Sequence, residues 1–276
     1  MAWKCKVPGV VPLLAALILV VAPAWAHSTG GVVHSYGNSA LGTVVLGLGR
    51  SGTPFAFVRD GAPRGFELDL ARAVAREMNI KLEVRWLARD ALLPALAAGE
   101  IDLVNVGALA GDAPESVDVV PYLEIGQHVV VRRDNPFAIH GPGDLSGTMV
   151  VATQDSPGEA YARELASWVG ESDKAPLDVH TMPMAQYTPT AVLFSHASAY
   201  FAPTAAVALQ AADPEPLVKP VPGLFKATGR LGFGFAVEHV ELKRDLRLAL
   251  AQVVVKGVYR ELLARYHIPE DCSPFR

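Results

Sequence analysis

The chain has 276 residues, with 24 basic and 28 acidic side chains and a formal net charge of −4. This balance offers no basic stripe that would hold nucleic acid, so we expect no nucleic-acid partner. Its two cysteines, Cys5 and Cys272, lie near opposite ends of the chain, and no cluster of Cys and His has the spacing of metal ligands. We therefore expect no intrachain disulfide in a processed protein, no metal site and no cofactor.

Residues 1–26 have the pattern of a secretory signal peptide. Lys4 and Lys6 precede an apolar run over residues 10–22, and Ala24-Trp25-Ala26 then offers a small-x-small cleavage site. The apolar run is short for a membrane span of about 20 residues, and an uncleaved anchor is the alternative. We expect a cleaved leader and a protein that works in a bacterial periplasm.

Processing at this site gives the first testable prediction. Exported protein should begin at His27, because Ala24 and Ala26 fit the small pockets of a signal peptidase. Mass analysis or N-terminal sequencing of the exported protein checks this, and finding Met1 on it would contradict the prediction. Residues 27–42, which are rich in Gly, Ser and Asn, should form a flexible leader.

Strands and helices alternate in the next part of the chain. On the first expected helix, Phe66, Leu70, Ala73 and Val74 fall on one face. Asp90 is a candidate N-cap and Gly99 a candidate C-cap for the second helix. The pattern predicts a strand over 43–48, a helix over 65–78, a strand over 81–86, a helix over 91–98 and a strand over 102–106.

A second α/β block follows. The pattern predicts strands over 127–132, 149–153, 198–202 and 231–237, helices over 158–169 and 204–211, a turn-rich stretch over 135–147, and a helical tail over 242–266 that breaks at Gly257. Such an order indicates an α/β protein in which helices flank mostly parallel sheets.

Several short segments of the first block follow one another in a specific order. They are Thr53-Pro54-Phe55-Ala56-Phe57, Gly65-Phe66-Glu67-Leu68-Asp69-Leu70-Ala71, Trp86, Leu92-Leu93-Pro94-Ala95-Leu96, Gly99-Glu100-Ile101-Asp102 and Asp118 to Tyr122. Together they resemble the bacterial extracellular solute-binding proteins of family 3, the periplasmic receptors best known from ABC transporters for polar amino acids. The resemblance extends over residues 43–268.

This resemblance implies a two-lobed periplasmic-binding-protein fold, in which each lobe is a mostly parallel sheet flanked by helices. Lobe 1 would comprise residues 43–130 plus 236–276, and lobe 2 residues 131–235. Two crossover segments, near Val131 and Phe235, would act as a hinge that closes on a small-molecule ligand. The partner would be an ABC permease, and the receptor itself a monomer.

The chain departs from the family at both charged anchors of an amino-acid ligand. In amino-acid-binding members, an arginine about twelve residues after the position of Asp102 holds the ligand carboxylate, and here that position is Pro114. The aspartate that pairs with the ligand ammonium is replaced by Pro203. We therefore expect a solute other than a standard α-amino acid. A shifted alignment is the alternative, with Arg132, Arg133 or Asp155 supplying the charge.

Candidate ligand-binding residues follow the expected strands, where ligand loops of α/β folds lie. Core packing is the alternative for Phe55 and Phe57, with Phe57 favoured as the core residue, and helix capping is the alternative for Asp155 and Ser156. The candidates are Phe55, Trp86, Gly107, Ala108, Leu109, Gln154, Asp155, Ser156 and Pro203.

A second resemblance supports an alternative function. Gly107-Ala108-Leu109-Ala110-Gly111, Pro121-Tyr122 and Ala202-Pro203 resemble family-3-like accessory proteins of periplasmic quinoprotein alcohol dehydrogenases, which serve a partner enzyme. The alternative is therefore an accessory protein that binds a periplasmic partner protein. No nucleophile-elbow, zinc-protease or P-loop motif occurs, so we expect no catalytic residues and no enzyme activity.

Overall fold

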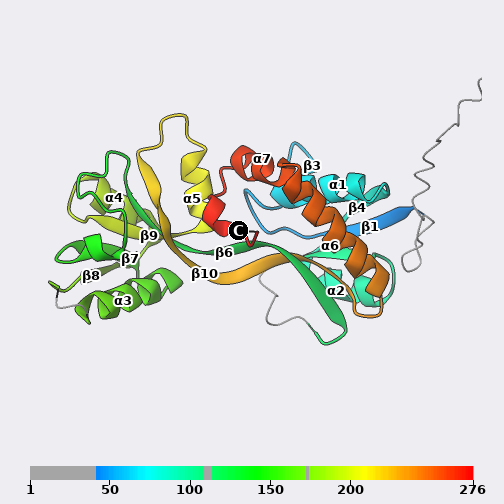
Figure 1. The fold of residues 1–276 in the computed structure, drawn as a ribbon, viewed down its shortest axis with the longest axis horizontal. Coiled ribbons are helices and arrows are strands. Elements are labelled where there is room, and N and C mark those ends of the chain that lie inside the picture. Colours follow the sequence, from blue (N-terminus) through cyan, green and yellow to red (C-terminus); the bar gives the residue numbers. More distant parts are fainter. Residues whose placement is uncertain (1–41, 108–113, 172–173, 276) are drawn as a thin grey trace, which may run out of the picture. The chain divides into compact units, whose positions relative to one another are not determined.

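The computed structural model describes residues 42–107, 114–171 and 174–275. The predicted signal peptide and nearly all of the predicted leader lie outside these residues. Eight strands form one sheet in the order β4-β1-β5-β10-β6-β9-β7-β8 (Figure 1). The strands are β1 (Thr43–Leu48), β4 (Lys81–Trp86), β5 (Leu103–Gly107), β6 (Val117–Arg132), β7 (Met149–Thr153), β8 (Asp178–Met182), β9 (Ala199–Pro203) and β10 (Val218–Ala236).

Two parallel triplets flank a central antiparallel pair of strands. In the first triplet β1 lies between β4 and β5, and in the second β7 lies between β8 and β9, all in parallel register. β6 and β10 are much longer and pair with each other antiparallel. β10 also pairs with β5, and β6 with β9, so these two strands connect both triplets.

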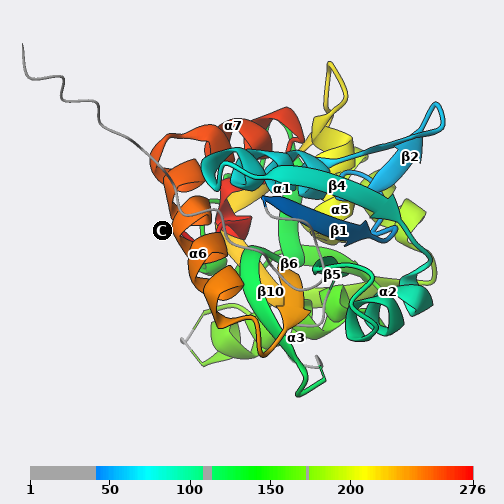
Figure 2. The same ribbon diagram turned by 90° about the vertical axis from the view of Figure 1, so that its right-hand side faces the viewer.

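Seven helices and three short 3-10 turns accompany this sheet in the described residues. α6 and α7 pack beside α1, and α3 packs on β7 and β8 (Figures 1 and 2). None of the described helices is long and apolar enough to cross a membrane. The elements are α1 (Phe66–Glu77), α2 (Arg89–Ala97), α3 (Pro157–Gly170), α4 (Thr188–Leu193), α5 (Thr204–Ala211), α6 (Val240–Val255), α7 (Val258–Arg265) and the 3-10 turns Pro142–Leu145, Ala185–Tyr187 and Glu270–Cys272.

The α/β prediction is confirmed, and most predicted elements are present. The strands over 43–48, 81–86 and 149–153 and the helix over 204–211 have the predicted bounds. Gly257 separates α6 from α7 in a left-handed conformation with φ 79°, which a glycine adopts without a Cβ clash.

The predicted caps of the second helix are wrong. Its N-cap is Ala88, and Asp90 lies in the first turn without capping a backbone N–H. The C-cap is Ala98, and Gly99 follows it with φ 68°. The helix begins at Arg89, after β4 ends at Trp86, and no side chain caps its first turn.

The elements predicted from the sequence did not include a hairpin, which is formed by β2 (Phe57–Arg59) and β3 (Ala62–Arg64). Asp60 and Gly61 form its turn, with φ angles of 53° and 73°. An Asp-Gly pair between two short strands is a strong hairpin signal because both residues accept positive φ. The reading also missed β8 and α4, and it made β6 and β10 too short.

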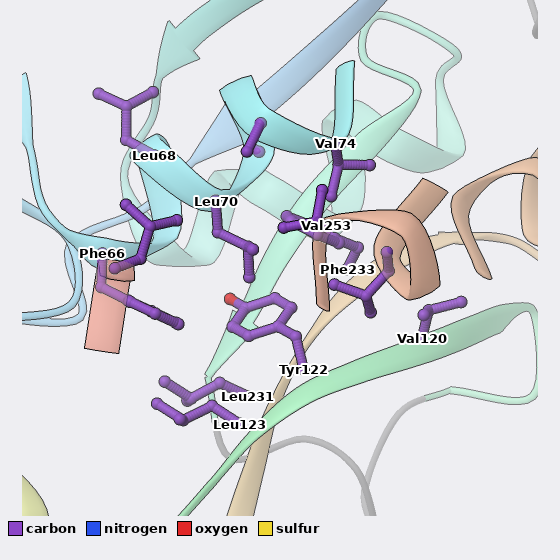
Figure 3. Close-up of a cluster of buried hydrophobic side chains, with 14 of the residues drawn as sticks. Phe66, Leu68, Leu70, Val74, Val120, Tyr122, Leu123, Leu231, Phe233 and Val253 are labelled. Atoms are coloured by element: carbon purple, nitrogen blue, oxygen red, sulfur yellow. The ribbon is translucent and has the colours of Figure 1, made fainter. Parts of the chain in front are cut away.

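In the described part of the chain, buried apolar side chains form four clusters, and the largest lies between α1, β1, β10, α6 and α7. Figure 3 shows part of it, with Tyr122 of β6 pointing toward Phe66 and Leu70 of α1. Leu231, Phe233 and other residues of the end of β10 pack in this same cluster. A second cluster joins β7, β9 and α3 to Val129 and Val131 of β6. The lobe boundaries given above stay a prediction.

Candidate functional site

The segment after β1 folds back on the first triplet. Its backbone closes a tight turn in which Phe55 N donates to Gly52 O at 2.8 Å and Gly52 N donates to Ala56 O at 2.9 Å. The start of α1 then binds it, since Phe66 N donates to Pro54 O and Glu67 N to Phe55 O, both at 3.0 Å. Residues 49–56, which we call the β1 loop, are thus tied to α1 at the carboxyl end of the sheet, where ligands of such folds bind.

Gly65 permits this close approach. A Cβ on Gly65 would lie 2.1 Å from Phe55 O, and its φ of 126° belongs to a region that only glycine adopts readily. The Gly at the start of the Gly65-Phe66-Glu67 segment is therefore explained by the backbone contact between α1 and the β1 loop.

Asn105 of β5 holds the other end of the β1 loop. Its Oδ1 accepts from Gly49 N at 2.6 Å, and its Nδ2 lies 3.0 Å from Gly49 O. The same nitrogen lies 3.1 Å from Ser51 Oγ and also donates to Glu67 Oε2. Ser51 Oγ donates to Glu67 Oε2 at 3.2 Å. A polar network of four residues therefore joins β5, the β1 loop and α1.

Glu67 is the charged member of this network and is only 1% exposed. Burial raises its pKa from 4.5 to about 7, against the opposing effects of the hydrogen bonds from Asn105 and Ser51 and of the charge of Arg89. Among the described residues its Oε1 atom has no hydrogen-bond partner, and neither does the buried hydroxyl of Tyr122. A carboxyl in these surroundings exchanges its proton near neutral pH.

The segment after β7 forms hydrogen bonds with the start of α3, the helix that follows it. Gln154 N donates to Met182 O at 2.8 Å, and its side chain is exposed. Asp155 adopts φ 53°, and its N–H donates to Glu159 Oε2 at 2.8 Å. Ser156 is the N-cap of α3 and accepts from Glu159 N at 3.2 Å. The capping interpretation of Ser156 is therefore confirmed.

Pro203 ends β9 opposite Gln127 of β6 and is exposed. Next to it, Thr204 Oγ1 accepts from Gly126 N at 3.0 Å and lies 3.2 Å from His128 Nε2. The buried Cys272 thiol lies 3.6 Å from the same histidine nitrogen. These contacts bring β6, the start of α5 and the C-terminal 3-10 turn together.

Residues 44–269 match the family of bacterial extracellular solute-binding proteins, family 3. The chain belongs to this family. It is 26% identical over 234 residues to the probable amino-acid-binding protein YxeM of Bacillus subtilis (strain 168). The aligned region covers 80% of this chain and 83% of that protein.

Two solved structures show the same fold. The second substrate binding domain of a putative amino acid ABC transporter from Streptococcus pneumoniae Canada MDR_19A has a TM-score of 0.67 at 18% identity, covering 81% of this chain and 99% of that domain. An ancestral cyclohexadienyl dehydratase has a TM-score of 0.66 at 19% identity, covering 82% and 92%. The two-lobed fold is thereby confirmed, and it alone does not separate a receptor from an enzyme.

The predicted site residues of this family 3 protein differ in how deeply they are buried. Phe55 is 6% exposed and belongs to the largest core cluster, whereas Phe57 is half-buried, so the expectation that Phe57 is the core residue is wrong. Trp86 is half-buried at the end of β4. Gly107 ends β5, and Ala108 and Leu109 lie outside the described residues.

The candidate residues therefore lie at strand ends of both triplets, and they differ in their access to a ligand. Gln154 and Pro203 offer exposed surface, whereas the side chain of Phe55 is buried in the largest core cluster. The site residues predicted from the sequence did not include Glu67 and Asn105, which form the polar network beside the β1 loop. A signal was present, because both polar residues occupy positions that the apolar pattern around them predicts to be buried.

Arg132 and Arg133, two of the three residues that would supply charge under a shifted alignment, lie at the end of β6. Arg132 ends β6, and the pairing of Val130 with Tyr200 and of Gln127 with Pro203 places Arg132 beyond the opposite end of β9 from Pro203. Its guanidinium binds Asp134 at 2.6 Å and also donates to Ser195. An open depression of about 830 Å³ lies there, lined by Arg132, Arg133, Asp134, Leu193, Phe194 and Leu217. We therefore do not include Arg132 in the candidate site.

Proposed function

We propose that this chain is the periplasmic substrate receptor of an ABC-type importer and that its solute is a small molecule other than a standard α-amino acid. Membership of family 3 over residues 44–269 supports the receptor role. The proposed specificity rests on the lack of charged anchor residues in the two segments that hold an amino-acid ligand in the family. No Lys or Arg occurs from Gly107 to Ser116, and the exposed residue at the end of β9 is Pro203.

A free α-amino acid would bind poorly to such a site for an energetic reason. Its carboxylate and ammonium lose hydration when the site encloses them, and each charge that finds no partner costs several kcal/mol. In the amino-acid-binding members that this chain resembles, an arginine and an aspartate offset this cost. Pro114 and Pro203 stand at those positions here and donate no hydrogen bond.

The proposal assigns ligand contacts to the ends of both triplets. Gln154, Asp155, Ser156 and Pro203 would face the solute from lobe 2, and Trp86, the segment from Gly107 to Leu109 and the β1 loop with Phe55 from lobe 1. The receptor would act as a monomer that closes about hinges near Val131 and Phe235. A true ligand should then reduce the radius of gyration in small-angle scattering.

A thermal-shift screen tests the specificity. The twenty standard amino acids at millimolar concentration should leave the melting temperature unchanged. A one-site ligand at 100 times its dissociation constant would instead stabilise the fold by about 2.7 kcal/mol, a rise of several degrees for a chain of this size. A clear shift with Glu, Gln, His, Arg or Lys would show that a clamp exists elsewhere in the chain.

The true solute can be identified by mass spectrometry of molecules released from denatured, freshly purified protein. Gln154→Ala should then weaken binding of that solute about threefold to tenfold, the size of one lost hydrogen bond. Gln252→Ala is the matched control, because this exposed glutamine lies on α6, away from the strand ends. Equal affinities of the two variants would remove Gln154 from the site.

The same experiments decide the alternative role. A chain that releases no solute, binds no amino acid and retains a quinoprotein dehydrogenase in a periplasmic pull-down would be an accessory protein. Release of a bound solute together with a thermal shift by that solute would support the receptor.

A further inference from the structure

Three acceptors compete for the side-chain amide nitrogen of Asn105. Gly49 O lies 3.0 Å from Nδ2, Ser51 Oγ lies 3.1 Å from it, and Glu67 Oε2 is its third acceptor. An amide nitrogen carries only two hydrogens. At any moment, therefore, at least one of the three acceptors receives no hydrogen of its own from Asn105. The two strongest acceptors bind the two hydrogens.

The charge on Glu67 sets the order of these acceptors. An ionised carboxylate accepts hydrogen bonds roughly twice as strongly as a neutral group, so charged Glu67 draws an Asn105 hydrogen away from the β1 loop. Neutral Glu67 is an ordinary acceptor, and both hydrogens are then free to bind Gly49 and Ser51. Burial raises the pKa of Glu67 to about 7, so both forms are present near neutral pH.

We propose that Glu67 is a positioning residue for the β1 loop, and that proton binding to its carboxyl determines how firmly Asn105 holds Gly49 and Ser51. The inference rests on the proposed function in one respect, namely that the β1 loop contacts the solute. Glu67 acts on this loop twice, through its side chain on Ser51 and through its backbone N–H on Phe55. Uptake of a proton should weaken the bond between Ser51 and Glu67 and strengthen the bonds from Asn105 to Gly49 and Ser51, and release of the proton should reverse this.

The groups around Glu67 leave its proton as the one exchanged near neutral pH. The positive charge of Arg89 of α2 favours the ionised carboxylate. Tyr122 of β6 stays neutral, because burial foremost and the charge of Glu67 next raise its pKa well above 10.0. Asn105 and Ser51 do not titrate in this range.

The test follows the backbone amide resonances of Gly49 and Ser51 in ligand-free, isotopically labelled protein from about pH 5 to about pH 9. In the wild type both amides should shift with a common midpoint near the pKa of Glu67, about 7. In Glu67→Gln, which keeps the shape and removes the proton, the shifts should disappear. In Asp102→Asn the midpoint should be retained.

Asp102 is the matched control because it is another buried acid of this sheet. Its Oδ2 accepts from Val45 N at 2.7 Å, four residues before Gly49 on β1, and it is 2% exposed. A pH-dependent shift of these amides that persists in Glu67→Gln would overturn the proposal. Loss of the shift in Asp102→Asn would overturn it as well.

A wild-type measurement covers the case in which Glu67→Gln does not fold. The carboxyl carbon of Glu67 in protein labelled at glutamate should titrate with the same midpoint as the Gly49 amide. A carboxyl that stays fully charged across this range would overturn the proposal. Because no ligand is used, this result is independent of the amino-acid screen, which tests the proposed function alone.

Discussion

In chemical denaturation of the wild-type protein between about pH 4.5 and about pH 6.5, the contributions of two buried groups to the free energy of unfolding are expected to oppose each other and largely cancel. Burial raises the pKa of Glu67 to about 7. Burial also lowers the pKa of His128 to about 4. Replacing either residue should reveal the pH dependence that the other one causes.

Glu67 stabilises the fold in acid. Its pKa is higher in the folded state than the ordinary 4.5, so folding favours its protonated form. The stabilisation is fully present below pH 4.5 and is lost as the pH rises through about 7. At 1.36 kcal/mol per pH unit, the loss in the free energy of unfolding is about 3 kcal/mol.

His128 acts in the opposite direction. Its side chain is fully buried, stacks on Phe225 at 4.6 Å between ring centroids and has its pKa lowered from 6.5 to about 4. Its stabilisation is therefore present above pH 6.5 and is lost as the pH falls through about 4. The loss is again about 3 kcal/mol, so the two effects cancel where their ranges overlap.

Urea denaturation at a series of pH values tests both groups. Relative to wild type, Glu67→Gln should become less stable as the pH falls, and His128→Gln should become less stable as the pH rises. Taking the difference from wild type removes the contributions of exposed carboxylates, which titrate alike in all three proteins. A Glu67→Gln profile parallel to that of wild type would show that the pKa of this carboxyl is the same in the folded and unfolded states.

Gly126→Ala is expected to destabilise the protein by roughly 3 kcal/mol, the upper end of common overpacking costs. A Cβ on Gly126 would lie 1.9 Å from Lys226 O and 2.8 Å from Ala227 Cα. Both atoms are backbone of β10, which pairs with β6 at this point, so they cannot move without disturbing the ladder. The melting temperature should fall by roughly 6 to 12 °C.

Gly141→Ala is the control for this substitution. A Cβ on Gly141 would meet no atom within 4 Å, and the residue lies outside the long strands. Its effect should stay within about 0.5 kcal/mol. Equal melting temperatures of the two variants would show that β6 and β10 do not approach each other this closely.

Local sequence pattern was enough for the short elements. β1, β4, β7 and α5 have the predicted bounds because their side-chain periodicity and the turn residues beside them are local signals. Gly257 marked the break in the C-terminal helices for the same reason, since a left-handed residue between two helices requires no distant partner.

Local sequence pattern did not predict the full length of the long strands β6 and β10. β6 contains Pro121 and Gly126, and β10 contains Pro220, residues that argue against strand when they are considered alone. Pairing between the two segments outweighs that preference, for example where Phe233 of β10 lies opposite Val120 of β6. Such pairing joins residues about 100 positions apart, and no window of sequence contains both.

The family was determined by the sequence itself, because ordered motifs are properties of the chain. The assignment of Pro114 and Pro203 to the two anchor positions also comes from the sequence and stays a prediction. The chemistry of Glu67 was decided only by the tertiary structure. Its buried side chain binds Asn105, 38 residues away in the sequence, and Ser51. Burial and these partners set its pKa, and neither exists until β1, β5 and α1 have packed together.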